Sequence, residues 1–408
     1  MTLTRIPLLV LILVLWSTSA LRMIRPHVPR SLLWSVKSSA EYEEAMQLRN
    51  SVLKKKLNQA SINTRGVFEK EELALLLAEY QINNPASAST SSASVSTASG
   101  GIVVAPLVNI YLDPQLQKNY LGVDLSNDRG DTARFIIDTG ASMNLIQSSI
   151  VGKFGLQSQT SNAYSTGLGG GGTIASQMTH MSNMNLKTTS GSTCKVQNNI
   201  PLAILSNPRA LPPGSDGLLG LQFLEALPGL VSFDLQSNTM TYGDFAPPSG
   251  LSVQKVPFRK ITTGLLVCDV YLQVNSQAPV CVTAMIDFGS TYSIANSLAV
   301  KALLGDGELN SLPDTNVKCM GIDGRPMTLK SIPVDIVRIG SSDPKNTRAI
   351  KPAAGNMPGT LFGASIPGLQ QIGLNDMPAM IIGMDVLADG FHKICFDFKD
   401  YYGNLYLE

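Results

Sequence analysis

The pattern of apolar and polar residues changes character near Ile102. From there to the C-terminus, short apolar or alternating runs are separated by glycine, asparagine, aspartate and proline, which is typical of an all-β protein. Predicted helices are few and short, and the clearest covers Ser297–Leu304. The pattern therefore predicts a mainly β body over residues 102–408. Its clearest predicted strands are Val103–Tyr111, Tyr120–Leu125, Arg134–Ile137, Thr173–Leu186, Leu202–Leu205 and Leu265–Val274.

The region before this body is helical in pattern rather than β. Residues 41–82 contain two runs with apolar residues at helical spacing, separated by a break that includes Gly66. Ser38 and Ser39 precede the first run and are good N-cap residues. We therefore expect a helical hairpin at 41–82. Residues 83–101 are mostly Asn, Pro, Ala, Ser, Thr and Gly, a composition that predicts a flexible linker.

One short motif occurs twice within the β body. Each copy is an apolar strand that ends in Asp-x-Gly, followed well downstream by two aliphatic residues and a glycine. The spacing is similar, at 220 − 138 = 82 and 383 − 287 = 96 residues. A repeat of this length is typical of two related lobes, which we place at 102–246 and 247–408. The two copies read Asp138-Thr139-Gly140 with Leu218-Leu219-Gly220, and Asp287-Phe288-Gly289 with Ile381-Ile382-Gly383.

The doubled motif resembles the aspartic protease family, of pepsin or retropepsin type, over roughly residues 103–408. The resemblance implies a mainly β, bilobal fold in which Asp138 and Asp287 form a catalytic dyad. Two carboxylates in contact share one proton, so that one can act as base on a water and the other as acid. The implied activity is aspartic endopeptidase, with a polypeptide substrate and with neither cofactor nor metal.

The resemblance also assigns supporting roles around the dyad. Gly140 and Gly289 would let the backbone turn tightly and point amides at the carboxylates. The Thr139 hydroxyl would donate to the backbone of the opposite lobe and lock the two loops together. Both aliphatic-Gly motifs would pack beneath these loops.

The second copy departs from the family pattern at Phe288, where threonine or serine is expected. Phe288 cannot make the hydroxyl bond, whose loss costs roughly 0.5–1.5 kcal/mol. A benzyl group must also fit where a small hydroxyl is expected, and catalysis is sensitive to small displacements. Two functions remain open: an endopeptidase, or a catalytically inactive protease-like scaffold that binds peptides or proteins. On this reasoning Phe288→Thr would restore the bond and hold or raise the rate.

A glycine-rich run predicts a flap over the substrate. It lies between the first aspartate and its aliphatic-Gly motif, at the position of a mobile hairpin, and Gly167, Gly169 and Gly170 would form its tip. The second half has a glycine-centred turn at 321–324 in the corresponding place.

The N-terminus is typical of a targeting segment. Arg5 precedes the apolar run from Ile6 to Trp16, and small residues lead to Ala20, so residues 1–20 are interpreted as a signal peptide. Residues 21–40 are basic and contain no acidic residue, which resembles a transit peptide. We therefore expect entry into the secretory pathway, followed either by plastid import through a bipartite address or by secretion with a basic propeptide. No membrane segment is expected in the mature form.

Bulk properties narrow the remaining function classes. The net charge of +1 gives no indication of a nucleic-acid partner. Residues 41–82 resemble a SAP-type helical hairpin, which leaves DNA binding open, although a propeptide or packing hairpin is the preferred interpretation. Five cysteines are scattered without disulfide-framework or metal-ligand spacing. The chain also lacks His-Glu-x-x-His and Gly-x-Ser-x-Gly, which argues against zinc and serine hydrolases.

Overall fold

The computed structural model divides the chain into two compact units, Met1–Val95 and Ser96–Glu408. In the first unit, the described residues are Ala45, Met46, Leu53, Leu57 and Ala74; all are helical, and Leu53 and Leu57 are fully buried. The rest of the predicted hairpin, the segments 1–20 and 21–40, and nearly all of the linker lie outside the described residues. In the second unit, the structure describes residues 101–408 except 114–117, 167–172, 197–198, 206–210, 262, 306–308, 321–325, 355–356, 367, 370–371, 375 and 399–402.

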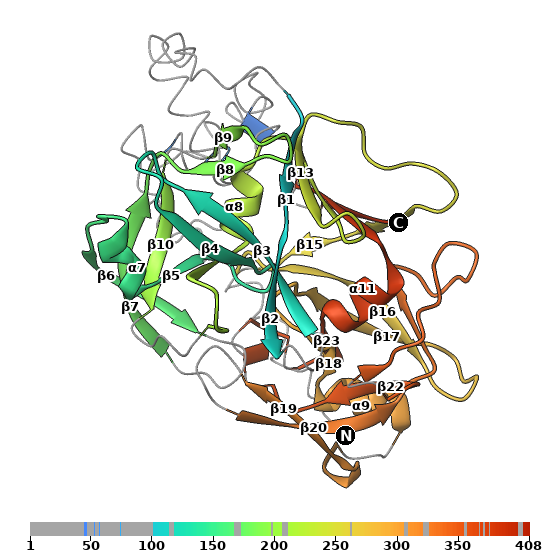
Figure 1. The fold of residues 1–408 in the computed structure, drawn as a ribbon. Coiled ribbons are helices and arrows are strands. Elements are labelled where there is room, and N and C mark those ends of the chain that lie inside the picture. Colours follow the sequence, from blue (N-terminus) through green and yellow to red (C-terminus); the bar gives the residue numbers. More distant parts are fainter. Residues whose placement is uncertain are drawn as a thin grey trace, which may run out of the picture. The chain divides into compact units, whose positions relative to one another are not determined.

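The first half of the second unit forms a ten-stranded sheet (Figure 1). Its strand order is β6-β7-β10-β5-β11-β4-β3-β8-β9, with β2 paired to β3. The strand that leads to the first aspartate, β4, therefore lies in the interior of the sheet. The bounds are β2 Val108–Asp113, β3 Lys118–Ser126, β4 Thr132–Ile137, β5 Asn144–Gln147, β6 Gln159–Thr166, β7 Thr173–Met181, β8 Asn185–Lys187, β9 Thr193–Lys195, β10 Ile200–Leu205 and β11 Gly217–Leu219.

The second half forms a nine-stranded sheet of its own (Figure 1). Its order is β15-β16-β17-β23-β18-β22-β20-β19, with β21 paired to β16. The strand that leads to the second aspartate, β17, again lies in the interior. The bounds are β15 Arg259–Lys260, β16 Leu266–Gln273, β17 Val280–Ile286, β18 Ile294–Ala295, β19 Asp314–Met320, β20 Pro326–Pro333, β21 Ile336–Ile339, β22 Thr360–Gly363 and β23 Ala379–Ile382.

The two halves repeat one topology. In the first, β11 runs parallel to β4 and antiparallel to β5; in the second, β23 runs parallel to β17 and antiparallel to β18. A short helix follows each aliphatic-Gly motif, α8 (Leu221–Ala226) and α11 (Met384–Gly390). Another helix follows β5 and β18, α7 (Ser148–Lys153) and α9 (Ser297–Leu304). The duplicated sequence motif thus corresponds to a duplicated fold, as expected for a bilobal, mainly β protein.

A six-stranded sheet joins the halves, in the order β1-β13-β12-β24-β25-β14. At its centre β12 pairs antiparallel with β24, and Ser232 lies opposite Cys395. Each lies 12 residues after the glycine of its aliphatic-Gly motif (232 − 220 and 395 − 383), so the two positions correspond and an approximate twofold axis passes between them. The bounds are β1 Val103–Pro106, β12 Leu230–Asp234, β13 Thr239–Gly243, β14 Gln254–Pro257, β24 Lys393–Asp397 and β25 Asn404–Leu407.

Two long strands predicted from the sequence are each divided in the structure. The predicted strand Val103–Tyr111 breaks at Leu107, where the chain passes from β1 in the six-stranded sheet to β2 beside β3. The predicted strand Thr173–Leu186 breaks near Asn183, whose φ of 55° lies in the left-handed region. The chain turns there from pairing with β10 to pairing with β3. In both cases the apolar pattern continues while the sheet partner changes.

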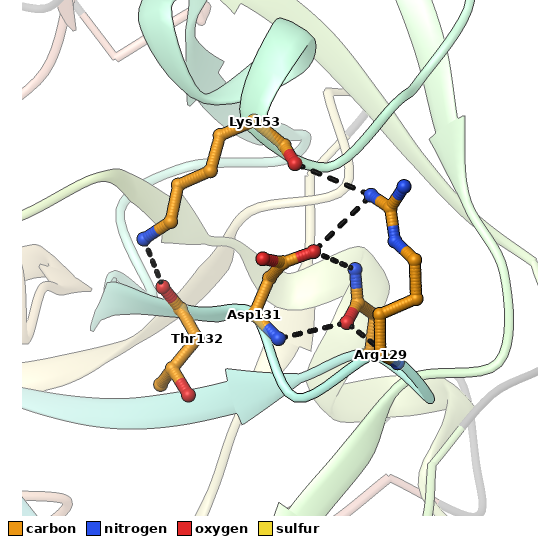
Figure 2. A network of polar contacts seen from close by, with 5 residues as sticks. Arg129, Asp131, Thr132 and Lys153 are labelled. Carbon is orange, nitrogen blue, oxygen red and sulfur yellow. Dashed lines mark hydrogen bonds and ion pairs between the residues drawn. The ribbon is translucent and has the colours of Figure 1, made fainter.

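A polar network ties helix α7 to the turn that leads into β4 (Figure 2). The side chain of Asn127 accepts from the backbone N–H groups of Arg129 and Asp131, which closes the turn. The Arg129 guanidinium contacts Asp131 (3.1 Å) and donates to Lys153 O (3.2 Å), while Lys153 Nζ donates to Thr132 O (2.8 Å). Arg129 and Lys153 are exposed and Asp131 is half-buried, so the ion pair contributes little. The network connects helix α7 to the first residue of β4.

Five phenylalanines, named here the aromatic cluster, pack against one another in the continuous apolar core that spans both halves. The rings pair edge-to-face or tilted at centroid distances between 5.1 and 6.5 Å, with one stacked pair. Such pairs contribute about 0.5–1.5 kcal/mol each beyond area burial. The cluster lies on the six-stranded sheet and on the loop of the second aspartate. Its members are Phe233, Phe258, Phe288, Phe396 and Phe398.

Candidate active site

Both aspartates lie in tight loops at the end of an interior strand. Asp138 follows β4 and Asp287 follows β17, and each strand pairs in parallel with the strand of its aliphatic-Gly motif. The backbone N–H of Asp138 donates to Leu219 O (3.0 Å), and that of Asp287 donates to Ile382 O (2.9 Å). The two loops are therefore fixed to their sheets in the same way.

The two carboxyl groups face each other across the glycines of the opposite loops. Gly140 N–H donates to Asp138 Oδ1 (2.9 Å), and Gly289 N–H donates to Asp287 Oδ1 (2.8 Å). A Cβ added at Gly140 would lie 2.4 Å from the carboxyl carbon of Asp287, and one added at Gly289 would lie 2.4 Å from that of Asp138. The carboxyl groups also share a hydrogen bond. Only glycine leaves room for this approach.

Two residues that the sequence analysis did not identify, Asn144 and Ser293, hold the glycines of the aliphatic-Gly motifs. The N–H of Gly220 donates to Asn144 Oδ1 (2.9 Å), and the N–H of Gly383 donates to Ser293 Oγ (3.0 Å). Both acceptors are buried and lie six residues after an aspartate, since 144 − 138 and 293 − 287 are equal. That shared offset, with a polar residue at or just before the first residue of a short apolar strand, is the sequence signal that could have identified them.

Thr139 connects the two halves directly beneath the dyad. Its hydroxyl donates to Ile286 O (2.8 Å) and accepts from the N–H of Phe288 (2.9 Å). Thr139 is fully buried, so both hydrogen bonds are shielded from water. A single side chain of the first loop thus satisfies two backbone groups of the second.

Phe288, the residue that departs from the family pattern, turns away from the dyad. Its ring is fully buried and lies 5.1 Å from the ring of Phe233 and 5.6 Å from that of Phe396, edge-to-face in both cases. The hydrogen bonds of the two aspartate loops nevertheless match in partners and length. The distortion expected from a benzyl group at this position is therefore absent from the described loops.

Burial and mutual repulsion keep the dyad from ionising twice. The pKa of Asp287 is raised well above its ordinary value, first by burial and then by the charge of Asp138. Burial also raises the pKa of Asp138, against the lowering effect of hydrogen bonds from Asp287 and from backbone amides. Asp287 is 8% exposed, whereas Asp138 is only half-buried. The pair therefore retains one shared proton above the ordinary carboxyl range.

The predicted flap corresponds to the hairpin of β6 and β7, which pair antiparallel from Gln159 opposite Met178 to Thr166 opposite Thr173. Its tip, with Gly167, Gly169 and Gly170, lies outside the described residues. The turn at 321–324 lies outside them as well, between the paired ends of β19 and β20. The flap assignment of the three glycines stays a prediction.

Among the described residues, no group of three or more His, Cys, Asp or Glu side chains is arranged to hold a metal ion. Four cysteines of that part are free thiols, namely Cys194, Cys268, Cys281 and Cys395. In the same part of the chain, no helix has the length and hydropathy needed to cross a bilayer.

Replacing Thr139 tests the connection between the halves. Thr139→Val keeps the shape but leaves Ile286 O and the Phe288 N–H buried without their partner. Each unpaired buried group costs about 1–3 kcal/mol, so the two groups together predict a loss of about 2–6 kcal/mol in the free energy of unfolding by urea titration. The matched control is Thr139→Ser, which keeps the hydroxyl. Equal losses in the two variants would show that the hydroxyl is not what stabilises this junction.

Stability should depend on pH through Asp287. Because its pKa is higher in the folded than in the unfolded chain, the folded state binds the extra proton and stability falls as pH rises through that window. Asp287→Asn removes this penalty. We expect the variant to melt at the wild-type temperature near pH 3 and above it at pH 7, with roughly 2–4 °C gained per kcal/mol.

The control for this experiment is Asp244→Asn, a substitution at an exposed carboxylate that directly follows β13. It should follow the wild type at every pH. An Asp287→Asn melting temperature that shifts equally at pH 3 and pH 7 would contradict the raised pKa of Asp287 as the cause.

Comparison with known proteins finds a family match in one segment of the first half. Residues 122–223 match the family described as aspartyl protease, and this segment contains Asp138 and Gly220. The match confirms the resemblance inferred from the motif. No curated protein matches the chain.

Two solved structures are similar to the chain at low identity. Basic 7S globulin from soybean is 12% identical, with 75% of this chain and 94% of that one covered and a TM-score of 0.47. Conglutin gamma, a unique basic 7S globulin from lupine seeds, is 13% identical, with 75% and 95% covered and a TM-score of 0.46.

Proposed function

We propose that this chain, with its aspartyl-protease family match and its doubled Asp-x-Gly motif, is an aspartic endopeptidase. The observation that carries the proposal is the approach of Asp138 and Asp287, each carboxyl group lying against the glycine of the opposite loop. Two carboxyl groups held this closely share one proton, which supplies a base and an acid at the same point. Amide hydrolysis needs both.

The asymmetry of the dyad suggests how the roles divide. Asp287, more buried and with its pKa raised well above the ordinary value, would hold the proton as the acid. Asp138, half-buried and more accessible, would be the base. In the proposed reaction, Asp138 takes a proton from water as the water oxygen attacks the amide carbon, while Asp287 protonates the carbonyl oxygen. Asp138 then gives its proton to the amide nitrogen and Asp287 takes back the proton of the new hydroxyl, so that the C=O bond re-forms as the C–N bond breaks.

The substrate class we propose is a polypeptide, with no cofactor. The hairpin of β6 and β7 would close over the bound chain, with Gly167, Gly169 and Gly170 at its tip. Location follows from the N-terminal segments: residues 1–20 would direct the chain into the secretory pathway, and 21–40 would determine whether it reaches a plastid or is secreted.

The competing function is a peptide- or protein-binding scaffold without catalytic activity, suggested by Phe288 in the second motif. The test is a peptide-library cleavage assay on the purified protein from acid to neutral pH, with and without pepstatin. Cleavage that pepstatin inhibits supports the endopeptidase. Binding of library peptides without cleavage at any pH would leave the scaffold.

A further inference from the structure

We propose that Phe288 is a positioning residue for the dyad: its ring anchors the second aspartate loop to Phe233 and Phe396 of the six-stranded sheet. This inference rests on the proposed function and concerns how Asp287 is held. The first loop is connected to its neighbour by a hydroxyl, at Thr139. The second loop has an apolar contact with the sheet instead.

The position of the ring supports this role. Phe233 and Phe396 occupy corresponding places in the two sequence repeats, on strands that pair about Ser232 and Cys395. The ring of Phe288 lies at similar distances from both, 5.1 and 5.6 Å, and the two partner rings are 6.0 Å apart. Phe288 therefore packs close to the approximate twofold axis.

The two loops differ in side-chain size at one pair of equivalent positions. Thr139 and Phe288 are equivalent residues of the repeat, and both are fully buried. The Thr139 side chain bonds to the backbone of the opposite half, and the Phe288 ring packs on Phe233 and Phe396. The Phe288 N–H donates to the Thr139 hydroxyl, and the Phe288 ring packs on the sheet. The residue after Asp287 is therefore held by both its backbone and its side chain.

The anchor also affects the surroundings of Asp287. The charged group that faces Asp287 is Asp138, and the amides of Gly140 and Gly289 face it too. Behind the loop, Asp385 on α11 accepts a hydrogen bond from Ser293 (2.6 Å). A loop that is no longer anchored would admit water beside Asp287 and reduce the burial that keeps its proton in place.

The sequence alone suggests that Phe288→Thr repairs a missing hydrogen bond. The structure leads to the opposite expectation, because threonine would leave a cavity against Phe233 and Phe396. Phe288→Leu keeps most of the apolar volume and so serves as the milder variant. The matched control is Phe258→Leu, since Phe258 belongs to the aromatic cluster and contacts Phe396 and Phe398 rather than the dyad loop.

The experiment measures kcat, KM and the pH profile of the full-length protein and these variants, with activity normalised to the folded fraction. We expect kcat to fall about tenfold for Phe288→Leu and about 10²-fold for Phe288→Thr, with KM changed less than about twofold. The upper limb of the pH profile should move to lower pH. Phe258→Leu should lose stability while keeping kcat and the profile. Equal kcat losses in Phe258→Leu and Phe288→Leu would overturn the proposal, as would unchanged kcat in both Phe288 variants.

A second readout separates this proposal from the proposed function. NMR of ¹³C-labelled aspartate carboxyl groups follows the dyad titration whether or not the wild type cleaves peptides. We expect the higher midpoint of the dyad to fall in Phe288→Leu and to stay in place in Phe258→Leu. An inactive wild type with this shift would reject the endopeptidase and retain the anchor. An unchanged midpoint in Phe288→Leu would reject the anchor.

Discussion

Asp138→Asn is expected to reduce kcat/KM for peptide cleavage by about 10⁴-fold, the upper end of what acid–base catalysis contributes. The substitution removes the carboxylate that would take the proton from water and keeps the shape of the side chain. Asp287→Asn should give a loss of similar size, because the two groups act as one unit. For the same reason the double variant should be no worse than either single one. The measurement is steady-state cleavage of a peptide selected from the library.

The cleavage rate of Asp287→Asn also tests whether the dyad forms within a single chain. Both variants should remain folded, since asparagine has the same shape and the loops are held by backbone bonds to Leu219 and Ile382. A wild-type rate in Asp287→Asn, together with an inactive Asp138→Asn, would contradict the intramolecular dyad. The active unit would then require a second copy of the chain that contributes its own Asp138.

Gly289→Ala is expected to reduce kcat/KM by more than about 10²-fold. The added Cβ would lie 2.4 Å from the carboxyl carbon of Asp138, closer than atoms approach without displacement. The carboxyl group must therefore move by an amount to which catalysis is sensitive. Gly140→Ala should do the same through Asp287, where the corresponding distance is also 2.4 Å.

The matched control is Gly152→Ala in helix α7, where a Cβ would meet nothing within 4 Å. Alanine is favoured over glycine within a helix by roughly 0.5–1 kcal/mol, so this variant should keep full activity and unfold at a slightly higher urea concentration. Full activity in Gly289→Ala, with melting behaviour like that of the wild type, would show that the carboxyl groups do not need this close approach.

Thr139 and Phe288 show that equivalent residues of a repeat can stabilise a junction by different means. A hydroxyl bond is directional and contributes about 0.5–1.5 kcal/mol net, while a buried phenylalanine contributes roughly 1.5–3 kcal/mol through its surface. The departure at Phe288 therefore does not by itself indicate a weakened site. Whether the site cleaves peptides is what the library assay decides.

The sequence by itself determined the two aspartates, their glycines and the duplication. These features are local: an apolar strand followed by Asp-x-Gly specifies its own turn, and a second copy at similar spacing indicates a second lobe. The helix at Ser297–Leu304 was predicted with its bounds for the same reason, because Asn296 caps it locally by accepting from Ala299 N–H (2.8 Å).

Only the tertiary structure decided what lies beside each of these residues. The strand breaks at Leu107 and Asn183 depend on which sheet the chain joins next, and the apolar pattern is the same on both sides of the break. Asn144 and Ser293 became part of the site through bonds to glycines 76 and 90 residues away. The place of Phe288 close to the approximate twofold axis arises from its contacts with Phe233 and Phe396. Such contacts join residues far apart in the chain, so no local pattern specifies them.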